Sequence, residues 1–164
     1  MNGQTPEPPV MLPPSSSQLP QFHIVGFTGH RKLVDSAITE KCIALVLASL
    51  REGSTGEWLA TSSAAQGGDL IFARQVIAAG IAWEAVLPLA PADFQKDFSP
   101  EGWREVEALL AQAKTVRVVS SFGSRDEAYL DCGIETVNTC DVLIAVWDGE
   151  PARGRGGTAD VVAF

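Results

Sequence analysis

Residues Asp141-Val-Leu-Ile-Ala-Val-Trp-Asp-Gly149 form an almost unbroken apolar run, and Gly154-Arg-Gly-Gly-Thr158 follows a few residues later. Such a run is typical of a strand that is buried on both faces of a parallel sheet. The glycines after it predict a loop, and Thr158 predicts the N-terminal cap of a helix. A strand, a glycine loop and a helix in this order turn backbone N–H groups and the positive end of a helix dipole towards a bound anion. This junction therefore predicts a phosphate-binding loop.

The rest of the chain alternates between strand-like and helix-like segments. We expect strands at residues 22–27, 58–62, 81–88, 116–119 and 142–147. We expect helices at residues 36–50, 69–79, 100–113 and 125–139, a further helix from Thr158, and a loop between Pro91 and Pro100. This alternation predicts the α/β class: a Rossmann-like fold with a mainly parallel sheet of five or more strands and helices on both faces.

The length of 164 residues suits one domain. Residues 1–21 hold six of the ten prolines and a run of three serines, so we expect a disordered leader there. Residues 22–164 are expected to form the domain. The helix that begins at Thr158 has only about two turns before Phe164, which is marginal for a helix, so we expect the natural chain to continue.

Composition limits the classes of function. The formal charge of −8, from 12 basic and 20 acidic side chains, argues against general binding to nucleic acid or anionic lipid. No apolar run reaches the ~18 residues of a membrane helix, so we expect a cytoplasmic protein without a membrane partner. The cysteines Cys42, Cys132 and Cys140 have spacings that match neither a zinc site nor a redox pair, and we expect reduced thiols and no metal.

Three loops together carry a resemblance to a known family. Gly26-Phe-Thr-Gly-His-Arg31 follows the first expected strand, Ala64-Ala-Gln-Gly-Gly-Asp69 follows the second, and the third loop ends at Thr158. They resemble the loops of the SLOG superfamily, the Rossmann-like domains shared by DprA-type DNA-processing proteins and LOG-type phosphoribohydrolases. The resemblance covers roughly residues 22–164. It implies a pocket at the carboxyl edge of the sheet for a nucleotide or a nucleotide-derived molecule such as AMP, ADP-ribose or an NAD-like ligand.

The last loop departs from the hydrolytic members of that superfamily, which carry a catalytic glutamate three residues after the loop threonine. Here that position is Val161, and Asp160 lies one residue earlier, about 100° away around a helix. We therefore expect a binding or sensor domain rather than an enzyme. The alternative is a phosphoribohydrolase that cleaves nucleoside monophosphates to base and ribose 5-phosphate, with Asp160 or Asp148 as the replacement acid.

The candidate ligand-binding residues follow the expected strands, where ligands of open α/β sheets bind. They are Gly26, Thr28, Gly29, His30, Arg31, Gly67, Gly68, Asp69, Pro88, Asp148, Gly149, Arg153, Arg155, Gly156, Gly157 and Thr158. The glycines would admit a phosphate, the arginines would pair with it, and the aspartates would accept ribose hydroxyls. Each residue also has a structural alternative: tight turns for the glycines, helix capping for Asp69, a turn for Asp148 and Gly149, and a solvated side chain for Arg31.

The resemblance and the charge together set the expected partners. We expect a small nucleotide-derived ligand, no required cofactor and no nucleic acid. Members of the superfamily commonly pair through helices beside the site, so we also expect a homo-oligomer. We further expect that the full protein can carry other domains fused to this one.

Overall fold

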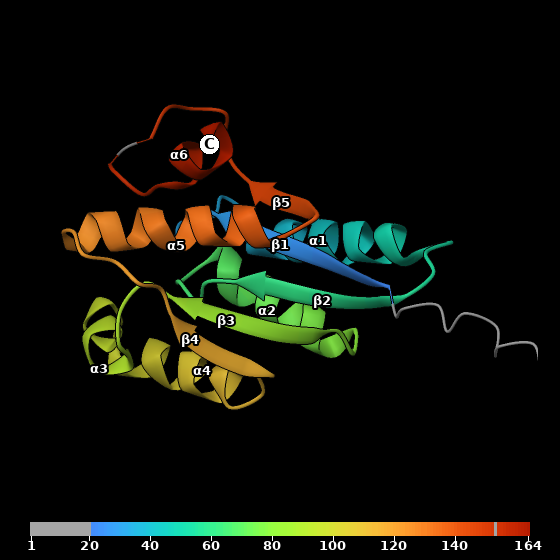
Figure 1. The fold of residues 1–164 in the computed structure, drawn as a ribbon, viewed down its shortest axis with the longest axis horizontal. Coiled ribbons are helices and arrows are strands. Elements are labelled where there is room, and N and C mark those ends of the chain that lie inside the picture. The colour runs from blue at the N-terminus through green and yellow to red at the C-terminus, as the bar shows by residue number, and fades with distance from the viewer. Residues whose placement is uncertain (1–20, 153) are drawn as a thin grey trace, which may run out of the picture.

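The computed structural model describes residues 21–152 and 154–164 and contains one five-stranded sheet (Figure 1). Its strands are β1 (Phe22–Gly29), β2 (Glu57–Ser62), β3 (Ala82–Leu87), β4 (Thr115–Val118) and β5 (Val142–Val146). The strand order is β4-β3-β2-β1-β5, and every pairing is parallel. Successive strands are thus added on one side of β1 up to β4, and β5 is added on its other side. Open α/β sheets bind ligands at such a change in strand order, here between β1 and β5.

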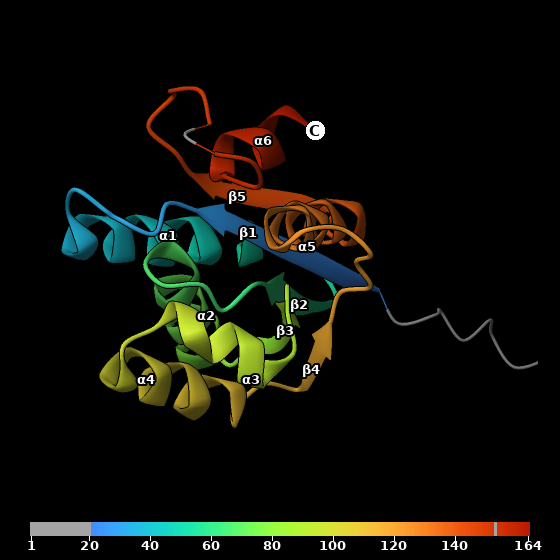
Figure 2. The same cartoon turned by 90° about the vertical axis from the view of Figure 1, so that its left-hand side faces the viewer.

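Helices cover both faces of this sheet. They are α1 (Ser36–Arg51), α2 (Gly68–Ala78), α3 (Pro91–Phe94), α4 (Pro100–Leu110), α5 (Arg125–Thr139) and α6 (Thr158–Ala163), with a short 3-10 turn, η1 (Gln95–Asp97), after α3. α1, α2 and α4 lie on one side, and α5 and α6 lie on the other (Figure 2). The predicted α/β class, with a parallel sheet and helices on both faces, is confirmed.

Side-chain caps explain why several helices begin where the sequence predicted. Asp35 accepts a hydrogen bond from the backbone N–H of Ile38 at 2.9 Å at the start of α1. At the start of α5, Ser124 accepts from the backbone N–H of Glu127, and the Glu127 carboxylate accepts in return from the Ser124 N–H at 2.6 Å. This reciprocal pair satisfies two N–H groups that the helix itself leaves unpaired.

The prediction of a loop between Pro91 and Pro100 was wrong, because this segment contains α3 and η1. Pro91 occupies the first turn of α3, where its missing N–H costs nothing. Phe94 is fully buried and meets the rings of Phe98 and Trp103 edge-on. Packing of Phe94 against these rings stabilises a helical turn that local sequence signals do not reveal.

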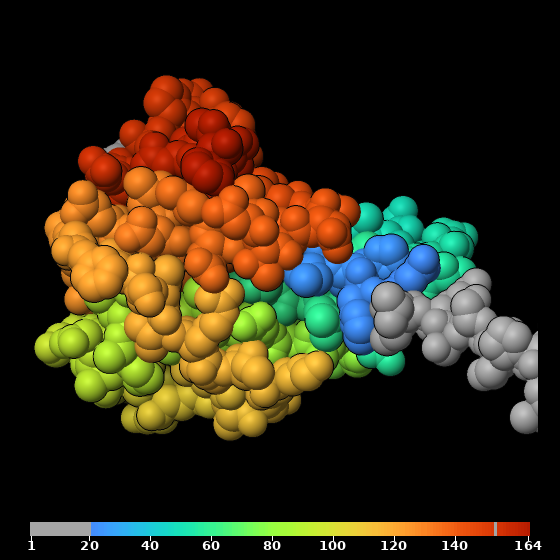
Figure 3. All heavy atoms as spheres, viewed as in Figure 1, coloured from blue at the N-terminus to red at the C-terminus, as the bar shows by residue number. Residues whose placement is uncertain are grey.

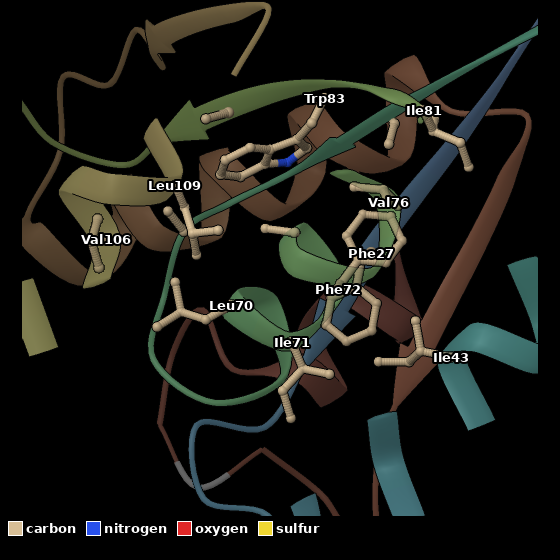
Figure 4. Packing of buried hydrophobic residues seen from close by; sticks show 14 of the residues in the cluster. Phe27, Ile43, Leu70, Ile71, Phe72, Val76, Ile81, Trp83, Val106 and Leu109 are labelled. Atoms are coloured by element: carbon tan, nitrogen blue, oxygen red, sulfur yellow. The ribbon is translucent and has the colours of Figure 1, made fainter. Parts of the chain in front are cut away.

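The main core fills the space between the sheet and α2 (Figure 4). The ring of Phe27 from β1 stacks on that of Phe72 from α2, with 4.8 Å between the ring centroids. Trp83 of β3 is buried, and its indole N–H donates to the Ser62 hydroxyl at 3.0 Å. Large apolar side chains therefore fix the sheet to this layer.

The opposite face of the sheet, under α5, carries small and polar residues instead. A Cβ on Gly26 of β1 would lie 2.7 Å from the Sγ of Cys140 at the end of α5, so only glycine allows this approach. The apolar cluster on this side is small and consists of Val86, Val119 and Cys132. α5 thus rests close to the sheet near the amino ends of the strands, with little apolar bulk beneath it.

A second glycine, Gly133 of α5, brings α6 into place. A Cβ on Gly133 would lie 2.3 Å from the Cγ2 of Val161, which is 3% exposed. This close contact fixes α6, and with it the glycine loop that precedes α6, above the carboxyl end of β1.

The predicted leader, residues 1–21, lies outside the described residues except for Gln21. The Gln21 carbonyl accepts a hydrogen bond from the Glu57 N–H at 2.9 Å, at the amino ends of β1 and β2. Across the described ranges, no helix combines the length and hydrophobicity needed to cross a bilayer.

Substitution of Gly133 by alanine is expected to push α6 away from α5. Overpacking of this kind costs about 1–3 kcal/mol, which urea unfolding measures directly. The double variant Gly133→Ala/Val161→Ala removes the clashing Cγ2, so we expect it to be more stable than Gly133→Ala alone. If the change in unfolding free energy of the double variant equals the sum of the changes of the two single variants, Gly133 and Val161 are not in contact.

Candidate functional site

Two adjoining cavities lie at the carboxyl ends of β1 and β2. The outer cavity, of about 560 Å³, is bounded by the β1–α1 loop, the first turns of α5 and the loop before α6. The inner cavity, of about 200 Å³, lies beneath it between β1, α5 and α6. Both are lined by His30, Arg31, Tyr129, Gly156, Gly157 and Thr158. In Figure 3 the C-terminal segment (red) stands directly above α5 (orange), the two elements whose loops and turns enclose this space.

Backbone contacts bring the strand ends together at this point. The His30 N–H donates to the Val146 carbonyl at 3.1 Å, and the Gly68 N–H donates to the His30 carbonyl at 3.1 Å. Gly67 has φ +90°, and a Cβ there would lie 2.3 Å from the Arg31 carbonyl oxygen. The loops after β1, β2 and β5 are therefore held against one another.

The glycine loop before α6 uses one of its N–H groups internally. Gly156 has φ +81°, and its N–H donates to the Asp160 carboxylate at 2.8 Å. The Gly157 N–H closes a turn on the Gly154 carbonyl. The N–H groups of Thr158 and Ala159, both at the outer cavity, have no acceptor among the described residues. Asp160 thus holds the loop in shape, while these two N–H groups have no partner in the described part of the chain and are open to an anion.

Three arginines line the outer cavity in this acidic protein. The Arg31 guanidinium carbon lies 4.7 Å from the centroid of the Tyr129 ring, within range of a cation–π contact. Arg155 reaches Glu127 only at 3.7 Å and is 64% exposed. Arg31 and Arg155 therefore present positive charge to the cavity with little neutralisation by protein carboxylates.

The third arginine is held by the 3-10 turn. Arg125 pairs with Asp97 at 2.5 Å and donates to the Asp93 carbonyl at 3.1 Å. The hydrogen bond to Asp97 raises the pKa of the Arg125 guanidinium. Tyr129 also donates its hydroxyl proton to Asp97. This network fixes the Tyr129 ring on which Arg31 rests.

Asp69, at the start of α2, lines the inner cavity and is 5% exposed. Burial raises the pKa of its carboxyl to about 8, although the positive charge of Arg31 acts in the opposite direction. Burial also raises the pKa of the neighbouring Cys132 thiol to about 12. Both groups are therefore mostly protonated at neutral pH, and the inner cavity has no full negative charge from them.

Asp148 lies beside the loops but outside the lining of both cavities. The Nε2 of His30 is 3.2 Å from the Asp148 backbone nitrogen and 3.1 Å from its carboxylate. Gly149, at φ +83°, continues a turn in which the Glu150 N–H donates to the Asp148 carboxylate. The neighbouring Trp147 is 40% exposed, and its indole N–H donates to the Glu150 carbonyl at 2.8 Å.

The structure brings together about half of the residues that the sequence predicted. The cavities are lined by Thr28, Gly29, His30, Arg31, Asp69, Arg155, Gly156, Gly157 and Thr158. The lining does not include Gly26, Gly67, Gly68, Pro88, Asp148, Gly149 or Asp160. Arg153 lies outside the described residues.

Packing explains why Gly26, Gly67 and Gly68 lie outside the cavity lining. Gly26 faces Cys140, and a Cβ on Gly68 would lie 3.0 Å from the Phe27 ring. Gly67 meets the backbone of the loop after β1. Pro88 follows β3, which is separated from β1 by β2. Gly26 thus lies inside a strand, Gly67 and Gly68 lie at the start of α2, and Pro88 directly follows a strand.

Sequence reasoning missed the contribution of α5 and η1. Arg125 and Tyr129 are four residues apart and therefore share a helix face, a spacing that could have been recognised. Tyr129 is also the one tyrosine of the chain. Asp97 could not be placed, since its turn was predicted as loop. Among residues 21–152 and 154–164, no three His, Cys, Asp or Glu side chains converge as metal ligands.

Replacement of Asp69 by asparagine is expected to change how stability depends on pH. The native state holds the Asp69 proton up to about pH 8, whereas the unfolded chain releases it near 3.8. This carboxyl therefore makes the native state less stable as pH rises from about 4 to about 8. We expect Asp69→Asn to gain stability relative to the parent protein between pH 5 and pH 9 in urea unfolding. A difference in unfolding free energy between Asp69→Asn and the parent protein that is the same at every pH would contradict the raised pKa of Asp69.

Comparison of the sequence with models of protein families finds no match. Comparison with curated protein sequences finds no match either. The fold class rests on the sheet and its helices, and the resemblance to the SLOG superfamily rests on the three loops.

Proposed function

We propose that the protein is a cytoplasmic binding domain for a nucleotide-derived ligand, and that a phosphate of this ligand lies in the outer cavity. The observation that carries the proposal is the pair of N–H groups of Thr158 and Ala159, which have no acceptor among the described residues and face the same cavity as Arg31 and Arg155. Fixed N–H donors and guanidinium groups are the usual partners of phosphate in proteins. In a chain of charge −8, this local arrangement favours one specific anion over polyanions in general.

The resemblance of the three loops to the SLOG superfamily supports a ligand such as ADP-ribose, AMP or an NAD-like molecule. Two adjoining cavities offer room for a phosphate and for the group attached to it. Such a domain needs no cofactor of its own. Its output would pass to an oligomeric partner or to a further domain.

Hydrolysis by a phosphoribohydrolase mechanism is the less favoured alternative. Val161 lines the inner cavity at the position where hydrolytic relatives have glutamate. The Asp160 carboxylate accepts the Gly156 N–H, and Asp148 contacts His30 outside both cavities. A general acid must lie within hydrogen-bond reach of the bond that breaks, so these positions favour binding without cleavage.

Removal of either exposed arginine should weaken ligand binding. Hydrogen bonds to charged groups contribute about 1.5–3 kcal/mol, so Arg31→Ala and Arg155→Ala are each expected to raise the Kd about 10- to 100-fold. Isothermal titration calorimetry with ADP-ribose, AMP and NAD measures this change. Arg104→Ala is the matched control, because Arg104 lies on α4 in a loose surface pair with Glu101.

Two results would count against the binding proposal. One is the absence of binding by all three ligands to the unmodified protein. The other is release of free adenine from AMP that is lost in Asp160→Asn, which would favour the enzyme.

We also propose that the protein self-associates through the outer face of α1. Ile38, Leu45 and Val46 are exposed there at 59%, 70% and 41%, and Cys42 lies between them. A helix face that points to solvent is normally polar. These side chains carry no charge, so two copies of an acidic protein can meet here with less repulsion than elsewhere.

Leu45→Lys is expected to convert the oligomer to a monomer, because two copies would each bury a lysine in the contact. Light scattering coupled to size-exclusion chromatography reports the mass. Gln112→Lys, which adds the same charge after α4, should leave the mass unchanged. A parent protein that is already monomeric at high micromolar concentration would refute self-association.

A further inference from the structure

The inner cavity contains polar groups that the protein leaves without partners. Apart from the weakly hydrogen-bonding Cys132 thiol, the buried Ser63 hydroxyl has no partner in the described part of the chain. Within the same ranges, the hydroxyls of Thr28 and Thr158 form no hydrogen bond with another group. A buried hydroxyl without a strong partner costs free energy, and this applies to Ser63. The Thr28 and Thr158 hydroxyls are not among the buried unsatisfied atoms of the described residues and are open to a ligand that both donates and accepts hydrogen bonds.

Asp69 adds a carboxyl group to these hydroxyls. Its side chain lines the inner cavity at the start of α2, an 11-residue helix, and is almost completely buried. A phosphate would be repelled here whenever Asp69 ionises, and no arginine other than Arg31 lines this cavity. The inner cavity therefore suits an uncharged group, in contrast to the outer one.

The chemical groups that line the inner cavity favour a sugar over a base. The Phe27 ring at the cavity wall is already stacked on Phe72, and the Tyr129 ring carries the guanidinium of Arg31. The faces of these two rings are therefore already engaged. Hydroxyl groups of a pentose can instead pair with the serine, the threonines and the carboxyl.

We propose that the inner cavity binds the sugar of the ligand whose phosphate lies in the outer cavity, and that protonated Asp69 donates a hydrogen bond to a sugar oxygen. This inference rests on the proposed function. It adds that the inner cavity holds a sugar and that the Asp69 carboxyl contacts this sugar in its protonated form. When Asp69 loses its proton, the donor is lost and a buried negative charge appears. Affinity for a sugar phosphate should therefore fall as Asp69 ionises.

Four other titratable side chains line the inner cavity beside Asp69. From the β1–α1 loop these are His30 and Arg31, and from α5 they are Tyr129 and Cys132. Arginine stays protonated at any pH used here. Burial raises the pKa of Tyr129 above its ordinary value and that of Cys132 to about 12. From α6, Asp160 is turned to the Gly156 N–H instead.

The test compares ribose 5-phosphate with inorganic phosphate between pH 7.5 and pH 9.5. The second pKa of a phosphate ester is about 6, so the charge of ribose 5-phosphate is constant over this range. With a carboxyl pKa of about 8, the affinity of the unmodified protein for ribose 5-phosphate should fall about 16-fold from pH 8 to pH 9.5. Calorimetry in two buffers of different ionisation enthalpy should show uptake of one proton at pH 9.5.

Two controls separate the contact from general effects of pH. Inorganic phosphate fills only the outer cavity and should show no such decrease. Asp69→Asn keeps a donor N–H but cannot ionise, so its affinity for ribose 5-phosphate should not change between pH 7.5 and pH 9.5.

The outcomes distinguish this inference from the proposed function. If ribose 5-phosphate binds without a decrease above pH 8, or if inorganic phosphate shows the same decrease, the role of Asp69 is refuted and the phosphate site stands. The comparison of the two probes needs no variant, so it remains decisive if Asp69→Asn does not fold. If neither probe binds at any pH, the proposed function itself fails, and the inference fails with it.

Discussion

α5 can lie against both β1 and α6 only because glycine leaves room for it at two points. Gly26 admits the end of α5 to the sheet, and Gly133 admits Val161 of α6 to the middle of the helix. A methyl group at either position would overlap its neighbour, and interiors packed at protein density do not absorb such an overlap without movement. The position of α6 decides where its preceding loop lies. Both cavities therefore depend on the two close contacts at Gly26 and Gly133.

The same arrangement separates charge within a small volume. On the outer side, guanidinium groups and open N–H groups face solvent, where an anion can approach. On the inner side, Asp69 is removed from water and keeps its proton, because burial acts more strongly on it than the positive charge of Arg31. A ligand that is anionic at one end and neutral at the other matches this division, whereas a ligand with charge at both ends does not.

Much of the fold could be predicted from the sequence, because its signals are local. The apolar run before Trp147 and the Ser124 and Glu127 pair define β5 and α5 almost to the residue. The helical turns around Phe94 were missed, because they depend on packing of its ring against Trp103 and Tyr129, which lie on other helices. The site was predicted where loops follow strands. Tyr129 was missed because it reaches the cavity from the side of a helix.

Trp147 has a further consequence for work on this protein. Its indole ring is partly exposed at the end of β5 and is tied to the Glu150 carbonyl, whereas Trp83 and Trp103 are buried in the core. Movement of the segment between β5 and α6 would alter the surroundings of this ring first. The protein thus carries an intrinsic fluorophore at the base of the loop before α6, and stopped-flow fluorescence could follow changes there without any attached dye.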